Sequence, residues 1–292
     1  MQESKPKTKL TNDQQKPKAA ATKSKKASRP QKPARTPREW KQLIATVAFY
    51  VAWTLFSLYV GQVLVAYILG YTLGQVIHGT LWMLIAYIVI YAVSLSLLIF
   101  APSKLLQLYR KRQQKAKSAK SEKNLTALEK DLTSTPESLG VQHLPTFVDI
   151  GLAPVGYFVY IVLASVFTNI MLGFSWYDAD QAQDLGIGYF VTDLNRILAI
   201  VAVVLIAPIA EELIMRGWLY GKLRSKLGIV VSILITSVLF GFLHGQWNVA
   251  VATFAMSIVL CGLREITGTI WSGVLLHILA NGIAFYISYI AF

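Results

Sequence analysis

The chain has 292 residues, 54% of them hydrophobic, and its mean hydropathy is +0.50. Soluble domains rarely reach this value, and the apolar residues come in runs long enough to cross a bilayer, so we expect a membrane protein. The single cysteine, Cys261, excludes an internal disulfide framework, and the net charge of +13 does not indicate nucleic-acid binding because of where the charges lie.

The first 41 residues form a strongly basic, polar segment. They contain 13 Lys or Arg residues against Glu3, Asp13 and Glu39, and they show no apolar periodicity. Such a segment cannot bury enough apolar surface to offset the entropy of ordering it, so we expect residues 1–41 to be a disordered cytoplasmic tail. A basic arm beside a membrane helix is more typical of attraction to anionic lipid than of nucleic-acid binding. Membrane lipids are therefore an expected partner, and nucleic acid is not.

The rest of the chain contains long apolar runs, which predict an all-α fold: a polytopic membrane helix bundle of about seven transmembrane helices with a cytoplasmic N-terminus. The expected helices are residues 42–70, 77–101, 150–173, 188–214, 229–246, 249–263 and 269–290. The expected regions are the tail 1–41, a transmembrane hairpin 42–101, a basic cytoplasmic linker 102–149 and a helical domain 150–292. This organisation is that of a multi-pass protein of the cell membrane.

Lysine and arginine gather on one side of this arrangement. Of the 28 such residues, all but Arg196 fall in the N-terminal tail, in segments 104–148 and 215–228, or at Arg264. By the positive-inside rule, this side is cytoplasmic. We interpret segment 104–148 as a solvated connector.

Polar residues that a spanning helix usually excludes occur in the last four expected helices. An ionisable residue there costs about 2.5–3.5 kcal/mol on insertion scales, so such residues usually serve a function. They form three clusters, Glu211-Glu212-Leu213-Ile214-Met215-Arg216, Phe240-Gly241-Phe242-Leu243-His244 and His277-Ile278-Leu279-Ala280-Asn281. Glu211 and His244 lie equally far from a helix break at Gly228, which predicts equal depth. At 1.5 Å per residue, the third cluster reaches a similar depth, so we expect one polar layer.

Two glutamates in the first cluster have different expected roles. Glu212 and Arg216 are four residues apart on one helix face, which predicts an ion pair that is structural rather than catalytic. Glu211 lies about 100° round the helix from Glu212 and can point elsewhere.

The three clusters are compatible with two kinds of site. A glutamate shielded from water can act as a general base, with one histidine sharing the attacking water and a second histidine and an asparagine donating to an oxyanion. Alternatively, Glu211, His244 and His277 could bind zinc, since two histidines and a carboxylate leave a position open for water. The usual His-Glu-x-x-His signature is absent, so the sequence leaves open whether the site holds zinc or no metal.

The three clusters resemble the motifs of the CPBP family of intramembrane proteases (CAAX-processing and bacteriocin-processing, also called Abi), which includes the Ras-converting enzyme. That family shows Glu-Glu-x-x-x-Arg, then Phe-x-x-x-His, then His-x-x-x-Asn on a later helix, and every motif residue is present here. The resemblance covers roughly residues 150–290, so it identifies 150–292 as a protease-like domain.

The resemblance implies a role for each motif residue. Glu211 and His244 would activate the attacking water. His277 and Asn281 would stabilise the oxyanion.

Glu212 and Arg216 would support the site. The implied activity is an intramembrane endopeptidase that hydrolyses peptide bonds of membrane-bound peptides or proteins, either prenylated CAAX-type C-termini or leader peptides. We expect its site to open toward the cytoplasm. Family members are described as metalloproteases or as glutamate-type proteases. Two alternatives are a non-catalytic immunity or scaffold protein and, less favoured because inverted repeats are absent, an ion-coupled transporter.

Overall fold

The computed structural model describes residue 1 and residues 36–77, 79–102, 104–105, 107–108, 132–181 and 192–289, and all elements within these residues are helical. The N-terminal elements are α1 (Pro37–Val63), the π-helix η1 (Leu64–Leu69), α2 (Gly70–Thr72), the 3₁₀ turn η2 (Leu73–Gln75), α3 (Gly79–Ile99), α6 (Pro136–Leu139) and α7 (Phe147–Met171). The C-terminal elements are α8 (Asp193–Ala199), π-helix η3 (Ile200–Ile206), α9 (Ala207–Glu212), π-helix η4 (Leu213–Tyr220), α10 (Gly221–Lys226), α11 (Ile229–Phe242), α12 (Trp247–Thr267) and α13 (Trp271–Tyr289).

Six helices in the described residues are long and apolar enough to cross a membrane, and α11 is a shorter apolar helix. The predicted all-α, multi-pass membrane architecture is thereby confirmed. Most of the predicted tail 1–41 lies outside the described residues. The first helix begins within that segment, at Pro37, where Thr36 and Glu39 form a reciprocal N-terminal cap.

The fourth helix is longer than the sequence suggested. A continuous helix runs through α8, η3, α9, η4 and α10, from Asp193 to Lys226, and we call it the central helix. The charges after residue 214 had indicated an exit from the membrane. Arg216 is fully buried in an ion pair instead, and Lys222 donates to the Thr133 carbonyl oxygen at 2.8 Å. Both cations are thus satisfied within the protein, and the helix continues.

The fifth helix is shorter than predicted. It ends at Phe242 instead of residue 246, and its 14 residues span about 21 Å, less than a hydrocarbon core of roughly 30 Å. The chain reverses at Gly245, whose φ of +70° favours glycine. A Cβ on Gly241 would lie 2.8 Å from the Ala250 carbonyl oxygen, so a glycine there lets α11 and α12 pack closely.

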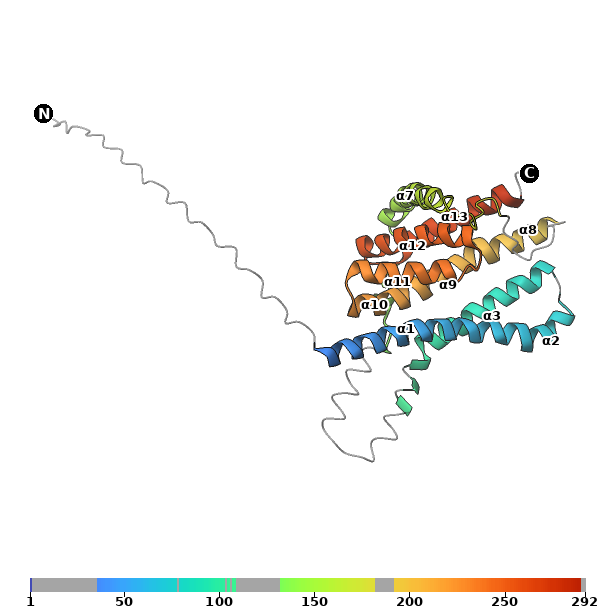
Figure 1. Cartoon of the computed structure of the whole chain (residues 1–292), viewed down its shortest axis with the longest axis horizontal. Coiled ribbons are helices and arrows are strands. Elements are labelled where there is room, and N and C mark those ends of the chain that lie inside the picture. The colour runs from blue at the N-terminus through green and yellow to red at the C-terminus, as the bar shows by residue number, and fades with distance from the viewer. Residues whose placement is uncertain are drawn as a thin grey trace.

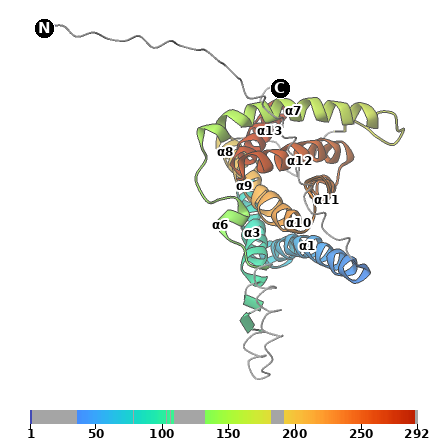
Figure 2. The same cartoon turned by 90° about the vertical axis from the view of Figure 1, so that its left-hand side faces the viewer.

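The helices form a bundle around the central helix (Figure 1). Helices α1 and α3 pack against each other on one side of it, and they also contact η4. On the other side α12 and α13 pack against each other, and α7 lies across both of them (Figure 2).

The bundle has two ends, which we name by their charge. The basic end comprises the start of α1, the α10–α11 turn, the α12–α13 turn and residues 133–149, where α7 begins. The opposite end comprises the end of η2, the start of α3, the end of α7, the starts of α8 and α12, and the end of α13.

Residues 133–149 lie across the basic end and are joined to it by hydrogen bonds. The Ile270 amide donates to the Gly140 carbonyl oxygen at 3.0 Å, and the Arg264 guanidinium donates to the Ser138 carbonyl oxygen at 3.2 Å. The indole of Trp271 donates to the His143 carbonyl oxygen. This part of the linker is therefore a packed segment, which we call the strap, and not the solvated connector expected from its composition.

A buried carboxylate anchors the end of the strap. Asp149 is 1% exposed, and it accepts hydrogen bonds from the Thr146 hydroxyl at 2.6 Å and the Ser272 hydroxyl at 2.6 Å. The Thr269 hydroxyl donates to Asp149 Oδ1, the oxygen that also accepts from Ser272, at 3.2 Å. Asp149 thus ties the start of α7 to the α12–α13 turn.

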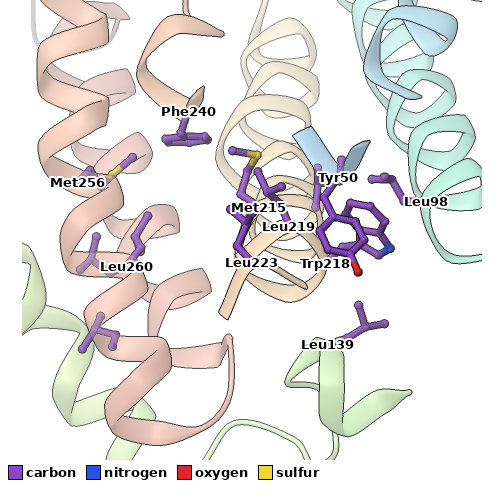
Figure 3. Close-up of a cluster of buried hydrophobic side chains, with 14 of the residues drawn as sticks. Tyr50, Leu98, Leu139, Met215, Trp218, Leu219, Leu223, Phe240, Met256 and Leu260 are labelled. Atoms are coloured by element: carbon purple, nitrogen blue, oxygen red, sulfur yellow. The ribbon is translucent and has the colours of Figure 1, made fainter. Parts of the chain in front are cut away.

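The main apolar core joins buried side chains of α1, α3, the central helix, α11, α12 and α13, and Figure 3 shows part of it. Trp218, Leu219 and Leu223 of the central helix are at most 1% exposed. Tyr50 of α1 packs edge-on against Trp218, and Leu139 of the strap belongs to the same cluster. Packed side chains therefore fill the basic half of the bundle.

Candidate functional site

The central helix departs from α-helical geometry where the polar layer begins. In the π-helix η3, the Ala207 amide bonds back five residues to the Ala202 carbonyl oxygen. The next amide in that pattern would belong to Pro208, which has no N–H, so the Val203 carbonyl oxygen is left without its helical donor. The Asn281 side chain donates to this oxygen at 3.0 Å and joins α13 to the central helix.

Glu212 forms a fully buried charged group with residues from two helices. The Arg216 guanidinium donates to Glu212 Oε1 at 2.9 Å, and both side chains have no exposed surface. His277 Nδ1 lies 3.0 Å from the same oxygen. Because a carboxylate paired with arginine accepts, Nδ1 is the donor. The Arg216 guanidinium also lies over the Phe240 ring, 4.4 Å from its centroid. The predicted ion pair is present, and it fixes His277.

Glu211 points into a different environment. Its side chain is 23% exposed, whereas that of Glu212 is 0% exposed. The Tyr91 hydroxyl of α3 donates to Glu211 Oε1 at 2.6 Å. The other oxygen, Oε2, lies 3.8 Å from His277 Nε2, so the two glutamates flank the two nitrogens of one imidazole.

His244 lies just after α11, in the turn toward α12. Its Nδ1 is 2.8 Å from the Phe240 carbonyl oxygen, so Nδ1 donates and Nε2 retains a lone pair. The His244 ring also packs edge-on against the Phe240 ring, with centroids 4.9 Å apart. Two contacts therefore hold the imidazole, although it lies in a turn.

A cavity of about 740 Å³ joins these residues. Glu211, His244, His277 and Asn281 all line it. The structure thus brings together the four residues predicted to be catalytic, and it keeps Glu212 and Arg216 behind them, outside the lining. No hydrogen bond joins Glu211 to His244 among the described residues. The partners that Glu211 does have are Tyr91 and His277.

The cavity extends in one direction from the polar layer. Its lining runs from His277 to Tyr289 on α13, from Met256 to Asn248 on α12, and from Glu211 to Val203 on the central helix. Each run ends near the opposite end of the bundle, and the remaining space toward the basic end is filled by the core and the strap. The expected opening toward the basic, cytoplasmic side is therefore not what the packing provides.

Glu211, His244 and His277, the zinc ligands that the sequence suggested, are not arranged around a common point. Among the described residues, no group of three His, Cys, Asp or Glu side chains is close enough to hold a metal ion. His277 turns its nitrogens to the two glutamates, and His244 turns Nδ1 to a carbonyl oxygen. Glu211, His244 and His277 do not fit a zinc site in this arrangement.

Tyr91 was not predicted from the sequence. It belongs to the N-terminal hairpin, which the motifs do not reach, and 120 positions separate it from Glu211. One signal was available: Tyr87 and Tyr91 are four residues apart, so two phenol groups lie on one face of a membrane helix and need partners. Tyr87 lines the cavity.

The C-terminal part of the chain is similar to a known protein family. Residues 193–283 match the family model described as Type II CAAX prenyl endopeptidase Rce1-like. This match covers the central helix, α11, α12 and most of α13, which carry all three motifs. No curated protein and no solved structure matches the chain.

Proposed function

Residues 193–283 form an Rce1-like domain, a domain of a protease family, and from this premise we propose that the protein is an intramembrane endopeptidase. It hydrolyses peptide bonds of membrane-bound peptides or proteins. One observation carries the proposal: Glu211, whose side chain is 23% exposed, lines a cavity of about 740 Å³ together with two histidines and an asparagine.

Glu211 is the general base in this proposal. Its Oε1 accepts from Tyr91, which leaves Oε2 to take a proton from water. His244 helps to hold that water through Nε2, the nitrogen that its contact with Phe240 leaves as an acceptor. The water oxygen bonds to the substrate carbonyl carbon, and the proton on Glu211 then passes to the leaving amine as the C–N bond breaks.

His277 and Asn281 serve the developing oxyanion. With its Nδ1–H on Glu212, a protonated His277 can donate from Nε2. Asn281 uses one N–H on the Val203 carbonyl oxygen and has a second N–H for the substrate.

The test is cleavage of a panel of prenylated and unmodified membrane peptides by the full chain in liposomes, with and without a chelator. Glu211→Gln should lower kcat by about 10²–10⁴-fold, the usual contribution of a general base. His244→Ala should lower it as well.

Two matched variants control for the substitutions themselves. Glu137 and His143 are exposed and lie in the strap, away from the cavity, so Glu137→Gln and His143→Ala should retain activity. Loss of activity in a control, or full activity of Glu211→Gln, would refute the assignment. Loss of wild-type cleavage on chelation would show that a metal takes part and that the site rearranges to bind it.

A further inference from the structure

The direction of the cavity bears on which substrates can reach the site. On α13, the exposed lining residues lie toward the opposite end. His277 is 2% exposed and Asn281 is intermediate, whereas Ala284 and Ser288 are exposed. Phe285 and Tyr289, which line the cavity beside them, are buried and intermediate. A side chain that lines a cavity and is also exposed marks its mouth. The mouth therefore lies toward the opposite end.

The other direction is closed by packed protein. Six and seven residues beyond Glu212, the central helix contributes Trp218 and Leu219, which are 1% and 0% exposed. Leu223 and the strap residue Leu139 complete this plug, and the strap itself is bonded to the ends of α10, α12 and α13. A peptide that approached from the basic end would have to displace this core.

The charges give the two ends their orientation. The sequence places 27 of its 28 Lys and Arg residues in segments assigned to the basic side, and the positive-inside rule makes that side cytoplasmic. At the opposite end, Asp178, Asp180 and Asp193 outnumber the single cation, Arg196. The mouth of the cavity thus faces away from the cytoplasm.

The walls of the cavity select for uncharged segments. Among its described lining residues, Glu211 is the one carboxylate and none is Lys or Arg. Tyrosines 87, 160, 177 and 289 supply much of the wall. Such a surface suits an apolar peptide segment with neutral hydrogen-bonding groups, and its described lining offers no Lys or Arg for a free C-terminal carboxylate.

We propose that the site is reached from the extracytoplasmic face and acts on membrane-anchored peptides presented there, cutting within an uncharged segment. The proposal rests on the proteolytic function argued above. A prenylated C-terminus presented in the cytoplasm would meet the closed end.

Access can be measured without activity, by cysteine labelling in the full-length protein. The native Cys261 is fully buried, so the chain provides a low background. Ser288→Cys at the mouth and Ser225→Cys at the basic end are matched substitutions of exposed serines. Ala252→Cys on α12 reports the interior of the cavity. A small, charged, membrane-impermeant methanethiosulfonate is applied to right-side-out and to inverted vesicles.

Ser288→Cys and Ala252→Cys should react at least tenfold faster in right-side-out vesicles, and Ser225→Cys should react at least tenfold faster in inverted ones. Reaction of Ala252→Cys only from the side of Ser225→Cys, or from neither side, would overturn the direction of the cavity. Reaction of Ser288→Cys only in inverted vesicles would overturn the extracytoplasmic assignment.

Cleavage then separates this inference from the proposed function. Right-side-out proteoliposomes should cut an anchored reporter whose apolar segment faces outward at least tenfold faster than one facing inward. A lysine beside the cut bond should slow cleavage. Faster cleavage of the inward-facing reporter would overturn the inference and retain the protease. Correct labelling without cleavage of any reporter would refute the protease and leave the cavity's direction intact.

Discussion

Polar and ionisable residues have different roles in the basic half and in the opposite half of the bundle. In the basic half, two buried ionisable groups are fully engaged: Asp149 accepts from three hydroxyl groups, and Arg216 pairs with Glu212. In the opposite half, the polar groups line a cavity, and the Glu211 side chain is 23% exposed. The two roles therefore divide between neighbouring residues: Glu212 belongs to the buried group that stabilises the fold, and Glu211 to the cavity proposed as the active site. Substitutions on either side of this boundary between Glu211 and Glu212 should change different measured quantities.

The largest effect on stability is expected from Arg216→Met. The substitution leaves the Glu212 carboxylate buried beside His277 without its cation, and breaking a buried pair in this way costs about 3–5 kcal/mol. The apparent melting temperature in detergent should fall sharply. Arg224→Met is the matched control, because its bridge to Glu265 is partly exposed and is expected to contribute at most about 1 kcal/mol.

A double variant sharpens the same test. Glu212→Gln combined with Arg216→Met removes both charges and should recover part of the lost stability, because no uncompensated carboxylate remains. Equal losses in Arg216→Met and Arg224→Met would contradict the division between a sealed polar group and a solvated surface.

A smaller loss is expected when the strap is released. Asp149→Ala removes the acceptor of the Ser272 and Thr269 hydroxyls and leaves them buried, at a cost of about 1–3 kcal/mol. The melting temperature should fall, while the activity of the folded molecules should remain. Asp180→Ala, at an exposed position of the opposite end, should change neither quantity. A loss of kcat in Asp149→Ala at a temperature where it is fully folded would show that the strap acts on the site.

The sequence predicted those features that depend on local spacing. Three motif clusters, the pairing of Glu212 with Arg216, and the existence of membrane-length helices all follow from positions three, four or about twenty residues apart. The position where the central helix ends could not be predicted in this way. A lysine such as Lys222 is typical of a loop outside the membrane, and only the structure shows that it donates to the Thr133 carbonyl oxygen.

Contacts between distant segments account for what the sequence could not show. The burial of Asp149 depends on the α12–α13 turn, more than 100 positions away. The direction of the cavity depends on which end of the bundle is filled, and that is decided by the packing of Leu139 and Tyr50 against the central helix. The same limitation concealed Tyr91.

Tyr91→Phe gives the smallest and most local test of the boundary. The phenol donates to Glu211 Oε1 at 2.6 Å and leaves Oε2 as the proposed base, which makes Tyr91 a positioning residue. Its loss should lower kcat about tenfold, or about 1.4 kcal/mol, with KM nearly unchanged, since the base is misaligned while the walls are intact. Tyr87→Phe, one helical turn earlier on the same face, keeps the contact between Tyr91 and Glu211 and should act mainly on KM through the cavity wall. Equal kcat for Tyr91→Phe and the wild type would mean that the N-terminal hairpin does not take part in the chemistry, and the boundary would then lie wholly within residues 193–283.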